Sequence, residues 1–204
     1  MDLRTFVKPD RPPFVPLPEV GQPAPPLPGA PPALGRPRIV AFLRHVGCPF
    51  AELTMKTLDA ASGRHPEVQF LAVSHGTPAA TRRWCAELQM GYGVMVVDDP
   101  TRHVYAAWGL GLTNLRHFLG LRSVGRAVSL ATRGIRNRHP SGSRWQQAGT
   151  FGIDAAGTLR WMHLPEHAGD LPDVEAAVLA VMRRVAPAAG RDSHDAHGDS
   201  LELR

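Results

Sequence analysis

The sequence has few cysteines and no long apolar run. Two cysteines in 204 residues are too few for the disulfide framework of a small secreted scaffold, or for a multi-cysteine metal site. No apolar stretch reaches the roughly 20 residues that a membrane-spanning helix needs. Residues 1–14 are charged and contain no hydrophobic signal core, so the cytoplasm is the expected location. A hydrophobic content of 43% is sufficient for the core of one globular domain.

Proline is concentrated near the N-terminus. Twelve of the 20 prolines lie between Pro9 and Pro37, where few backbone donors remain for regular structure. This composition favours an extended, polyproline-like arm over residues 1–37 that lies over the domain. Presentation of proline motifs to a partner is the alternative interpretation. Small and polar residues at the other end predict a disordered tail over residues 186–204.

Between these ends, the apolar pattern alternates between strands and helices. Short apolar runs predict strands, the last two of which are joined by a tight turn, at residues 38–44, 68–73, 94–97, 150–153 and 159–163. Helical spacing predicts helices over residues 49–61, 77–90 and 172–185, with a short helix after Pro100. This element order predicts a thioredoxin-like α/β domain over residues 38–185, with a mixed sheet and helices on both of its faces.

One basic segment does not fit this alternation. Residues 100–153 contain no Asp or Glu, and seven arginines lie between residues 114 and 144. Apolar residues recur there at helical spacing, which predicts a basic helical insertion at about residues 112–145. It is interpreted as a helix that caps the domain, with a lid that attracts anionic substrates as one alternative. Binding of nucleic acid or an anionic membrane through residues 112–144 is the other, although few aromatic residues are present to stack on bases.

The string Phe42–Phe50, FLRHVGCPF, contains the candidate nucleophile. Cys48 lies where the first strand ends and the first helix begins, between Gly47 and Pro49. A sulfur at a helix N-terminus faces unpaired backbone N–H groups and the positive end of the helix dipole, and both favour the thiolate. Arg44 and His45 are close in sequence and would add positive charge. We interpret Cys48 as a reactive thiol; the alternative is a small buried core residue.

Three segments together resemble a known family. FLRHVGCPF, the DDP-x4-Y-x2-W-G-L stretch at Asp98–Leu110, and WQQAGTFGID at Trp145–Asp154 with the GTLRWMHLPEHAGDLPDV that follows resemble peroxiredoxin-like proteins. These belong to the alkyl hydroperoxide reductase/thiol-specific antioxidant (AhpC/TSA) superfamily. The resemblance implies an antioxidant oxidoreductase in which Cys48 is the peroxidatic cysteine, attacks a hydroperoxide and becomes a sulfenic acid. Arg44 matches an arginine that precedes this cysteine in such proteins, and His45, Gly47 and Pro49 would support the site.

The sequence also departs from the peroxiredoxin pattern. The threonine usually found three residues before the cysteine is replaced by His45, and the proline seven residues before it by Ala41. Peroxiredoxins usually have a second arginine around the later strand, where this sequence has Gln147. Ala51 three residues after Cys48 excludes a CxxC disulfide reductase. Cys85 is the only other thiol; it is interpreted as a core cysteine in the second helix, with a resolving role as the alternative.

The sequence therefore predicts thiol-dependent peroxide reduction of the one-cysteine type. The partners would be a hydroperoxide substrate and an external thiol or thioredoxin-type reductant, and a homodimer is left open. No metal or organic cofactor is expected, because the scattered histidines lack metal-ligand spacing. The alternative function is a thioredoxin-like binding module with weakened catalysis, which acts through the proline-rich arm or the basic insertion.

Overall fold

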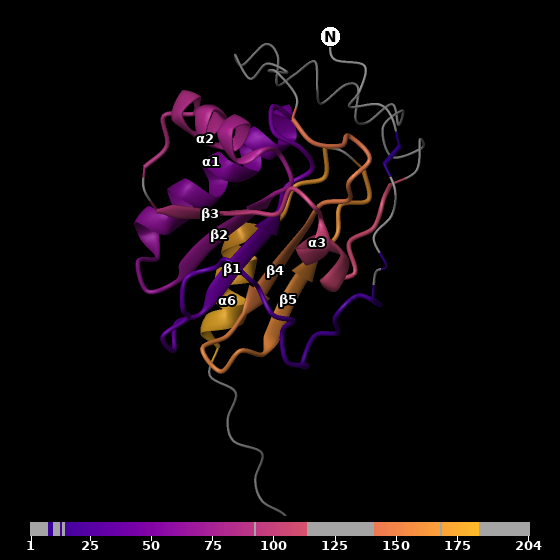
Figure 1. Cartoon of the computed structure of the whole chain (residues 1–204). Coiled ribbons are helices and arrows are strands. Elements are labelled where there is room, and N and C mark those ends of the chain that lie inside the picture. The colour runs from indigo at the N-terminus through magenta and orange to yellow at the C-terminus, as the bar shows by residue number, and fades with distance from the viewer. Residues whose placement is uncertain are drawn as a thin grey trace, which may run out of the picture.

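The described part of the chain folds around a five-stranded sheet (Figure 1). The computed structural model describes residues 8–9, 13, 15–91, 93–113, 141–167 and 169–183. The strands are β1 (Arg38–Phe42), β2 (Gln69–Ser74), β3 (Val94–Asp98), β4 (Gly149–Ile153) and β5 (Leu159–His163). The helices are α1 (Pro49–Arg64), α2 (Pro78–Glu87), α3 (His103–Ala107) and α6 (Val174–Met182). Most of the predicted basic helix and the predicted C-terminal tail lie outside the described residues.

The strand order is β3-β2-β1-β4-β5. β1, β2 and β3 run parallel, because α1 and α2 each return the chain to the same end of the sheet. β4 and β5 form an antiparallel hairpin that is added beside β1. β1 is therefore the central strand, and its carboxyl end opens directly into the loop that carries Cys48. This mixed sheet is the predicted thioredoxin-like α/β fold.

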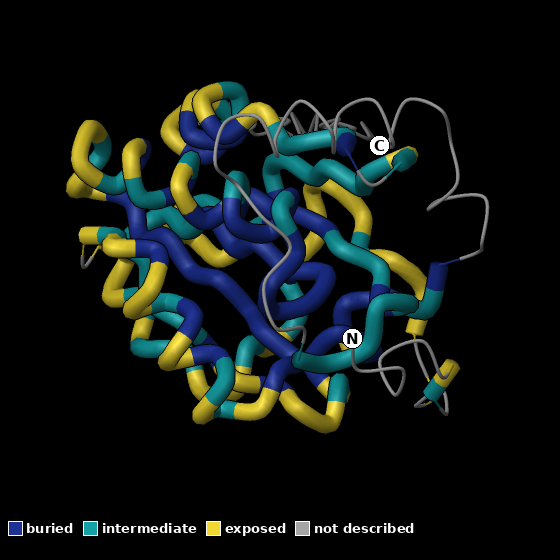
Figure 2. Tube along the Cα trace, turned by 90° about the horizontal axis from the view of Figure 1, so that it is seen from above, coloured by how far each residue is buried: buried dark blue, intermediate teal, exposed yellow. Residues whose placement is uncertain are grey.

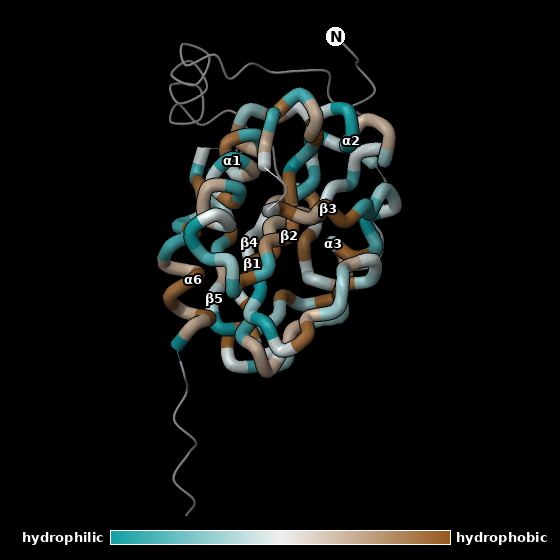
Figure 3. The backbone as a smooth tube through the Cα atoms, turned by 90° about the vertical axis from the view of Figure 1, so that its left-hand side faces the viewer, coloured by the Kyte–Doolittle hydropathy of each residue, from teal (hydrophilic) through white to brown (hydrophobic). Residues whose placement is uncertain are grey.

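Helices cover both faces of the sheet, as the sequence predicts. Alternate residues of β1 point to opposite sides: Ile39 packs in a cluster with residues of α1 and α6, while Phe42 packs with Tyr105 and Trp108. α2 joins α1 on the first face, where Trp84 packs with Ala72 of β2. The central strands β1 and β2 are buried on both faces, and every residue of β2 is buried. Figure 2 shows these buried segments at the centre of the molecule, and Figure 3 shows the hydrophobic character of β2 and β3.

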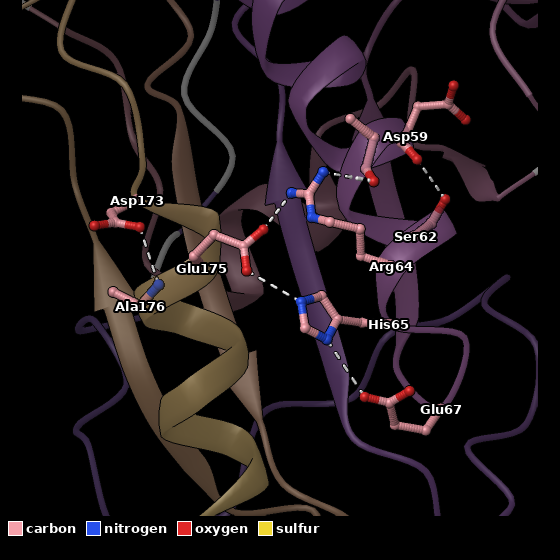
Figure 4. A network of polar contacts seen from close by, with 9 residues as sticks. Asp59, Ser62, Arg64, His65, Glu67, Asp173, Glu175 and Ala176 are labelled. Carbon is pink, nitrogen blue, oxygen red and sulfur yellow. Dashed lines mark hydrogen bonds and ion pairs between the residues drawn. The ribbon is translucent and has the colours of Figure 1, made fainter.

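The helix boundaries follow local caps and tertiary packing. Thr77 caps α2 by accepting a hydrogen bond from the Ala80 N–H at 3.3 Å, as a helix start there requires. α1 runs to Arg64, beyond the predicted end at residue 61. Its last turn is tied to the start of α6, because the Glu175 carboxylate lies between Arg64 and His65 (Figure 4). α1 and α6 are thereby joined at their ends as well as through the core.

Residues 15–37 lie against the domain. Pro23 forms an isolated antiparallel bridge with Thr158, and the indole N–H of Trp108 donates to the Pro26 carbonyl at 3.1 Å. Leu27 packs on the core cluster of the α3 face. Within the described part of the chain, no helix has the length and apolar character needed to span a bilayer.

Candidate active site

Cys48 lies at the junction between β1 and α1. Gly47 has a φ of 82°, in the left-handed region where glycine is tolerated best, and this turns the chain into the helix. Cys48 is the N-cap residue of α1, and its carbonyl accepts the Glu52 N–H at 2.9 Å. Pro49 occupies the first turn, as predicted. Cys48 is only 3% exposed, so bulk water does little to screen its thiol from the charges that surround it.

The surroundings of Cys48 stabilise its thiolate. Burial by itself raises the pKa of the thiol, because it penalises the charged form. The His45 ring, through its charge and a hydrogen bond to the sulfur, the Arg44 guanidinium and the backbone N–H of Ala51 oppose this effect. Together they lower the pKa of Cys48 from 9.0 to about 6. The structure thus brings together Arg44, His45 and Cys48, all three of which are buried.

His45 has one nitrogen already engaged. Its Nδ1 lies 2.9 Å from the Val46 carbonyl oxygen, which can only accept, so Nδ1 carries a proton. Nε2 is the nitrogen that remains available to the sulfur. In this tautomer, Nε2 accepts from a neutral thiol or, as an imidazolium, donates to the thiolate.

Arg44 is held by a segment that arrives from far along the chain. Its Nη2 donates to the Arg144 carbonyl at 3.5 Å. Burial lowers the pKa of Arg44, the nearby Cys48 sulfur raises it and the neighbouring Arg144 lowers it. Ser141 forms an isolated antiparallel bridge with Val46, one residue before Gly47. Residues 141–146, here called the return segment, therefore border the cysteine loop; they complete the predicted insertion and reach β4.

A pocket opens beside the cysteine loop. It lies between the start of α1, the start of β4 and the loop before α6, and Arg44 and Ala51 border it on the cysteine side. The lining is mostly apolar, with the hydroxyls of Thr54 and Thr150 and the Asp170 carboxylate as polar groups. The other lining residues are Phe42, Leu43, Phe50, Ala148, Gly149, Pro165, Leu171 and Pro172. Arg44 is thus the residue of the Arg44–His45–Cys48 group that lines this pocket.

Cys85 lies in α2 and packs against the apolar cluster that contains Cys48 and Trp84. It is half-buried, and both cysteines are free thiols. Burial raises the pKa of Cys85, and the Asp98 carboxylate raises it further. The two thiols therefore have opposite tendencies: Cys48 ionises near neutral pH and Cys85 does not. Among the described residues, no group of three or more His, Cys, Asp and Glu side chains is placed to hold a metal ion.

A buried polar network that the sequence pattern does not predict lies next to this site. His75 directly follows β2, and its ring contacts Ser143 of the return segment and the hydroxyl of Tyr105. Tyr105 in turn bonds the carbonyls of Leu43 and Val73. The only signal in the sequence was the position of His75 at the carboxyl end of a buried strand, where loops of a parallel sheet gather.

Comparison with known proteins identifies the class to which this fold belongs. A family model described as "AhpC/TSA antioxidant enzyme" matches residues 50–167, more than half of the chain. The protein belongs to this family, as the sequence resemblance implies. The match begins two residues after Cys48, so it rests on the body of the domain and not on the cysteine loop. A search of curated protein sequences found no match.

Solved structures with a similar fold include a peroxiredoxin-like protein, a thiol peroxidase and a peroxiredoxin. A peroxiredoxin-like protein from Aquifex aeolicus superposes with a TM-score of 0.58 at 17% identity, over 82% of this chain and 88% of that one. A thiol peroxidase from Chromobacterium violaceum gives 0.55 at 12% identity, over 85% and 92%. A cysteine-to-serine mutant of peroxiredoxin 6 of Arenicola marina gives 0.51 at 12% identity, over 71% and 59%. These similarities show the thioredoxin-like fold, and family membership supports peroxide reduction in general.

Proposed function

We propose that this protein reduces hydroperoxides through Cys48 and that it works as a one-cysteine peroxidase. The observation that carries the proposal is the lowered pKa of Cys48, about 6, in a buried position at the N-terminus of α1. At pH 7 most of a thiol with that pKa is thiolate, the form that attacks peroxides. Membership of the AhpC/TSA family supports the same chemistry.

In the proposed reaction, the Cys48 thiolate attacks the terminal oxygen of the hydroperoxide. A sulfur–oxygen bond forms, the O–O bond breaks, and the departing alkoxide or hydroxide takes up a proton to leave as alcohol or water. Cys48 is oxidised to the sulfenic acid, and the peroxide is reduced by two electrons. One external thiol then condenses with the sulfenic acid and releases water, and a second thiol cleaves the mixed disulfide to restore Cys48.

His45 and Arg44 have distinct roles in this proposal. The His45 ring is hydrogen-bonded to the sulfur while its Nδ1 is held by the Val46 carbonyl, so it stabilises the thiolate and stays beside the reacting atoms. The Arg44 guanidinium stabilises the thiolate before the attack and the negative charge that develops on oxygen during it. His45 thus occupies the position of the usual threonine and places a ring nitrogen, in place of a hydroxyl, beside the sulfur.

The one-cysteine assignment rests on the environment of Cys85. Because burial and Asp98 raise its pKa, Cys85 is a poor nucleophile toward a sulfenic acid at neutral pH. Cys85 also lies within α2. A disulfide with Cys48 would require the two Cα atoms to lie within about 7 Å of each other, while Cys85 is held in the helix. We therefore propose that an external thiol, and not Cys85, reduces the Cys48 sulfenic acid.

The proposal is tested by following peroxide consumption in the presence of a dithiol or a thioredoxin system. Wild type, Cys48→Ser and Cys85→Ser are compared at pH 7, with hydrogen peroxide and an organic hydroperoxide as substrates. Turnover that is lost in Cys48→Ser and retained in Cys85→Ser is the expected result. Loss of turnover in Cys85→Ser would replace the one-cysteine assignment with a two-cysteine one. A wild-type protein that consumes no peroxide would favour the alternative of a binding module.

A further inference from the structure

We propose that His75 is a positioning residue for the Cys48 site. It fastens the return segment (residues 141–146) onto the loop that carries Arg44 and Cys48. The inference deepens the proposed function and rests on Cys48 as its reactive thiol, but its central residue, His75, lies outside the segments on which the sequence resemblance is based.

The hydrogen bonds of His75 define its role. Nε2 lies 3.0 Å from the Ser143 backbone nitrogen and 3.1 Å from the Ser143 carbonyl oxygen, so it can accept from the N–H or donate to the carbonyl of the same residue. Nδ1 faces the Tyr105 hydroxyl, 3.4 Å away, so both ring nitrogens have a partner. Burial lowers the pKa of His75 to about 3, although a hydrogen bond to Ser143 opposes this. At every physiological pH the ring is neutral and acts as a fixed connector, not as an acid or base.

The return segment is shaped to fit this ring. Gly142 has a φ of 89°, and a Cβ at that position would lie 2.7 Å from the Cδ2 and Nε2 atoms of His75. Only glycine allows both the backbone conformation and the close approach. On the other side of Gly142, Ser141 exchanges two backbone hydrogen bonds with Val46, at 3.2 and 3.3 Å. His75 and Val46 thus hold adjacent points of the same short segment.

Tyr105 extends the network to the strand that leads into the site. Its hydroxyl is directed at the carbonyls of Leu43, at 2.6 Å, and Val73, at 2.7 Å. Leu43 immediately precedes Arg44. Burial and the Asp99 carboxylate raise the pKa of Tyr105, so its proton stays in place for these bonds. Hydrogen bonds therefore hold the chain at two points next to Arg44. Tyr105 bonds the carbonyl of Leu43, the residue before Arg44, and the Arg44 guanidinium bonds the Arg144 carbonyl of the return segment.

The consequence for Cys48 follows from which groups act on its thiolate. His45 and Arg44 lower its pKa, and both lie in the loop that the return segment holds. Arg144 adds positive charge beside Arg44, and His45 and Arg102 are the charged groups that act on His75. If the return segment detaches, Arg44 and His45 lose their fixed places near the sulfur. The pKa of Cys48 then moves toward the ordinary thiol value.

The test measures the ionisation of Cys48 directly, in the full-length protein with Cys85→Ser so that one thiol remains. The rate of alkylation by iodoacetamide is recorded from pH 5 to pH 9. His75→Leu removes both ring nitrogens, His75→Gln retains an acceptor for the Ser143 N–H, and Val178→Ala removes core volume under α6 as a control for general destabilisation. His75→Leu is expected to raise the midpoint by at least about one pH unit, so that alkylation at pH 6 slows by about fivefold.

The other variants separate positioning from stability. His75→Gln should keep its midpoint closer to wild type than His75→Leu does, and Val178→Ala should keep the wild-type midpoint. A folded His75→Leu protein with an unchanged midpoint overturns the inference. If His75→Leu does not fold, Gly142→Ala takes its place: the added methyl group displaces the ring, and an unshifted midpoint there overturns the inference equally. A wild-type midpoint near 9 would instead overturn the proposed function itself.

Discussion

The loss of the His45 ring should raise the pKa of Cys48, and the size of the change can be worked out from the site. His45 acts on the sulfur through both its charge and a hydrogen bond. A hydrogen bond to a charged group contributes about 1.5–3 kcal/mol, and one pKa unit corresponds to about 1.4 kcal/mol. His45→Phe keeps a ring but removes both nitrogens, so it should raise the pKa of Cys48 from about 6 by about one to two units.

Alkylation kinetics provide the assay for this prediction. In a Cys85→Ser background, the rate at pH 6 should fall by about five- to fifty-fold in His45→Phe, because the reactive thiolate fraction falls by that factor. At pH 9 the two proteins should react at similar rates. His65→Phe is the matched control, since His65 lies at the other end of α1 and bonds Glu175. An unchanged rate at pH 6, or an equal loss in the control, would refute the reasoning.

Three further predictions concern stability. Because the pKa of Cys48 is lowered in the folded state, ionisation of Cys48 stabilises the fold, and this contribution is complete above pH 9. That contribution falls by about 1.4 kcal/mol per pH unit down to pH 6. In urea unfolding, the free energy of unfolding of Cys48→Ser should not show this dependence on pH. Equal dependence in Cys48→Ser and wild type would contradict the lowered pKa. Asp99→Ala should destabilise the fold by about 1–2 kcal/mol, because its carboxylate accepts three N–H groups at the start of α3; denaturant unfolding with no measurable loss would contradict the capping role. Glu175→Gln should cost less than about 1 kcal/mol, because Glu175 and Arg64 are half exposed, and a larger loss that persists in high salt would contradict this.

Much of the fold could be predicted because each element has a local cause. Apolar runs of β1 and β2 are long enough for strands buried on both faces, and Thr77 with Pro78 specifies where α2 starts. The end of α1 could not be placed so well, because Ser62 and Gly63 are weak helix formers. Packing overrides this preference: the last turn of α1 buries Ala61 and meets Glu175 of α6. Tertiary contacts of this kind leave no local signature.

The candidate site also has a part that local sequence predicts and a part that depends on long-range contacts. Cys48, with Arg44 and His45 before it and Gly47 and Pro49 around it, lies within one short string, so local reasoning about a helix N-terminus could find it. The partnership of His75 with Ser143 joins residues 68 positions apart, and no periodicity links them. Gly142 likewise lies in no motif, although its backbone comes close to the His75 ring. Long-range polar contacts are thus the part of the site that sequence pattern does not reveal.

The most direct test of the central claim is intact-mass analysis after limiting hydrogen peroxide, with a sulfenic-acid trap present. Wild type and Cys48→Ser are treated in parallel, together with a free thiol as an oxidation control. The account predicts a trap adduct that forms within seconds on wild type, maps to Cys48 and is absent from Cys48→Ser. A wild-type mass that stays unchanged while the control thiol oxidises would contradict the account. A loss of two hydrogens that joins Cys48 to Cys85 would contradict its one-cysteine form.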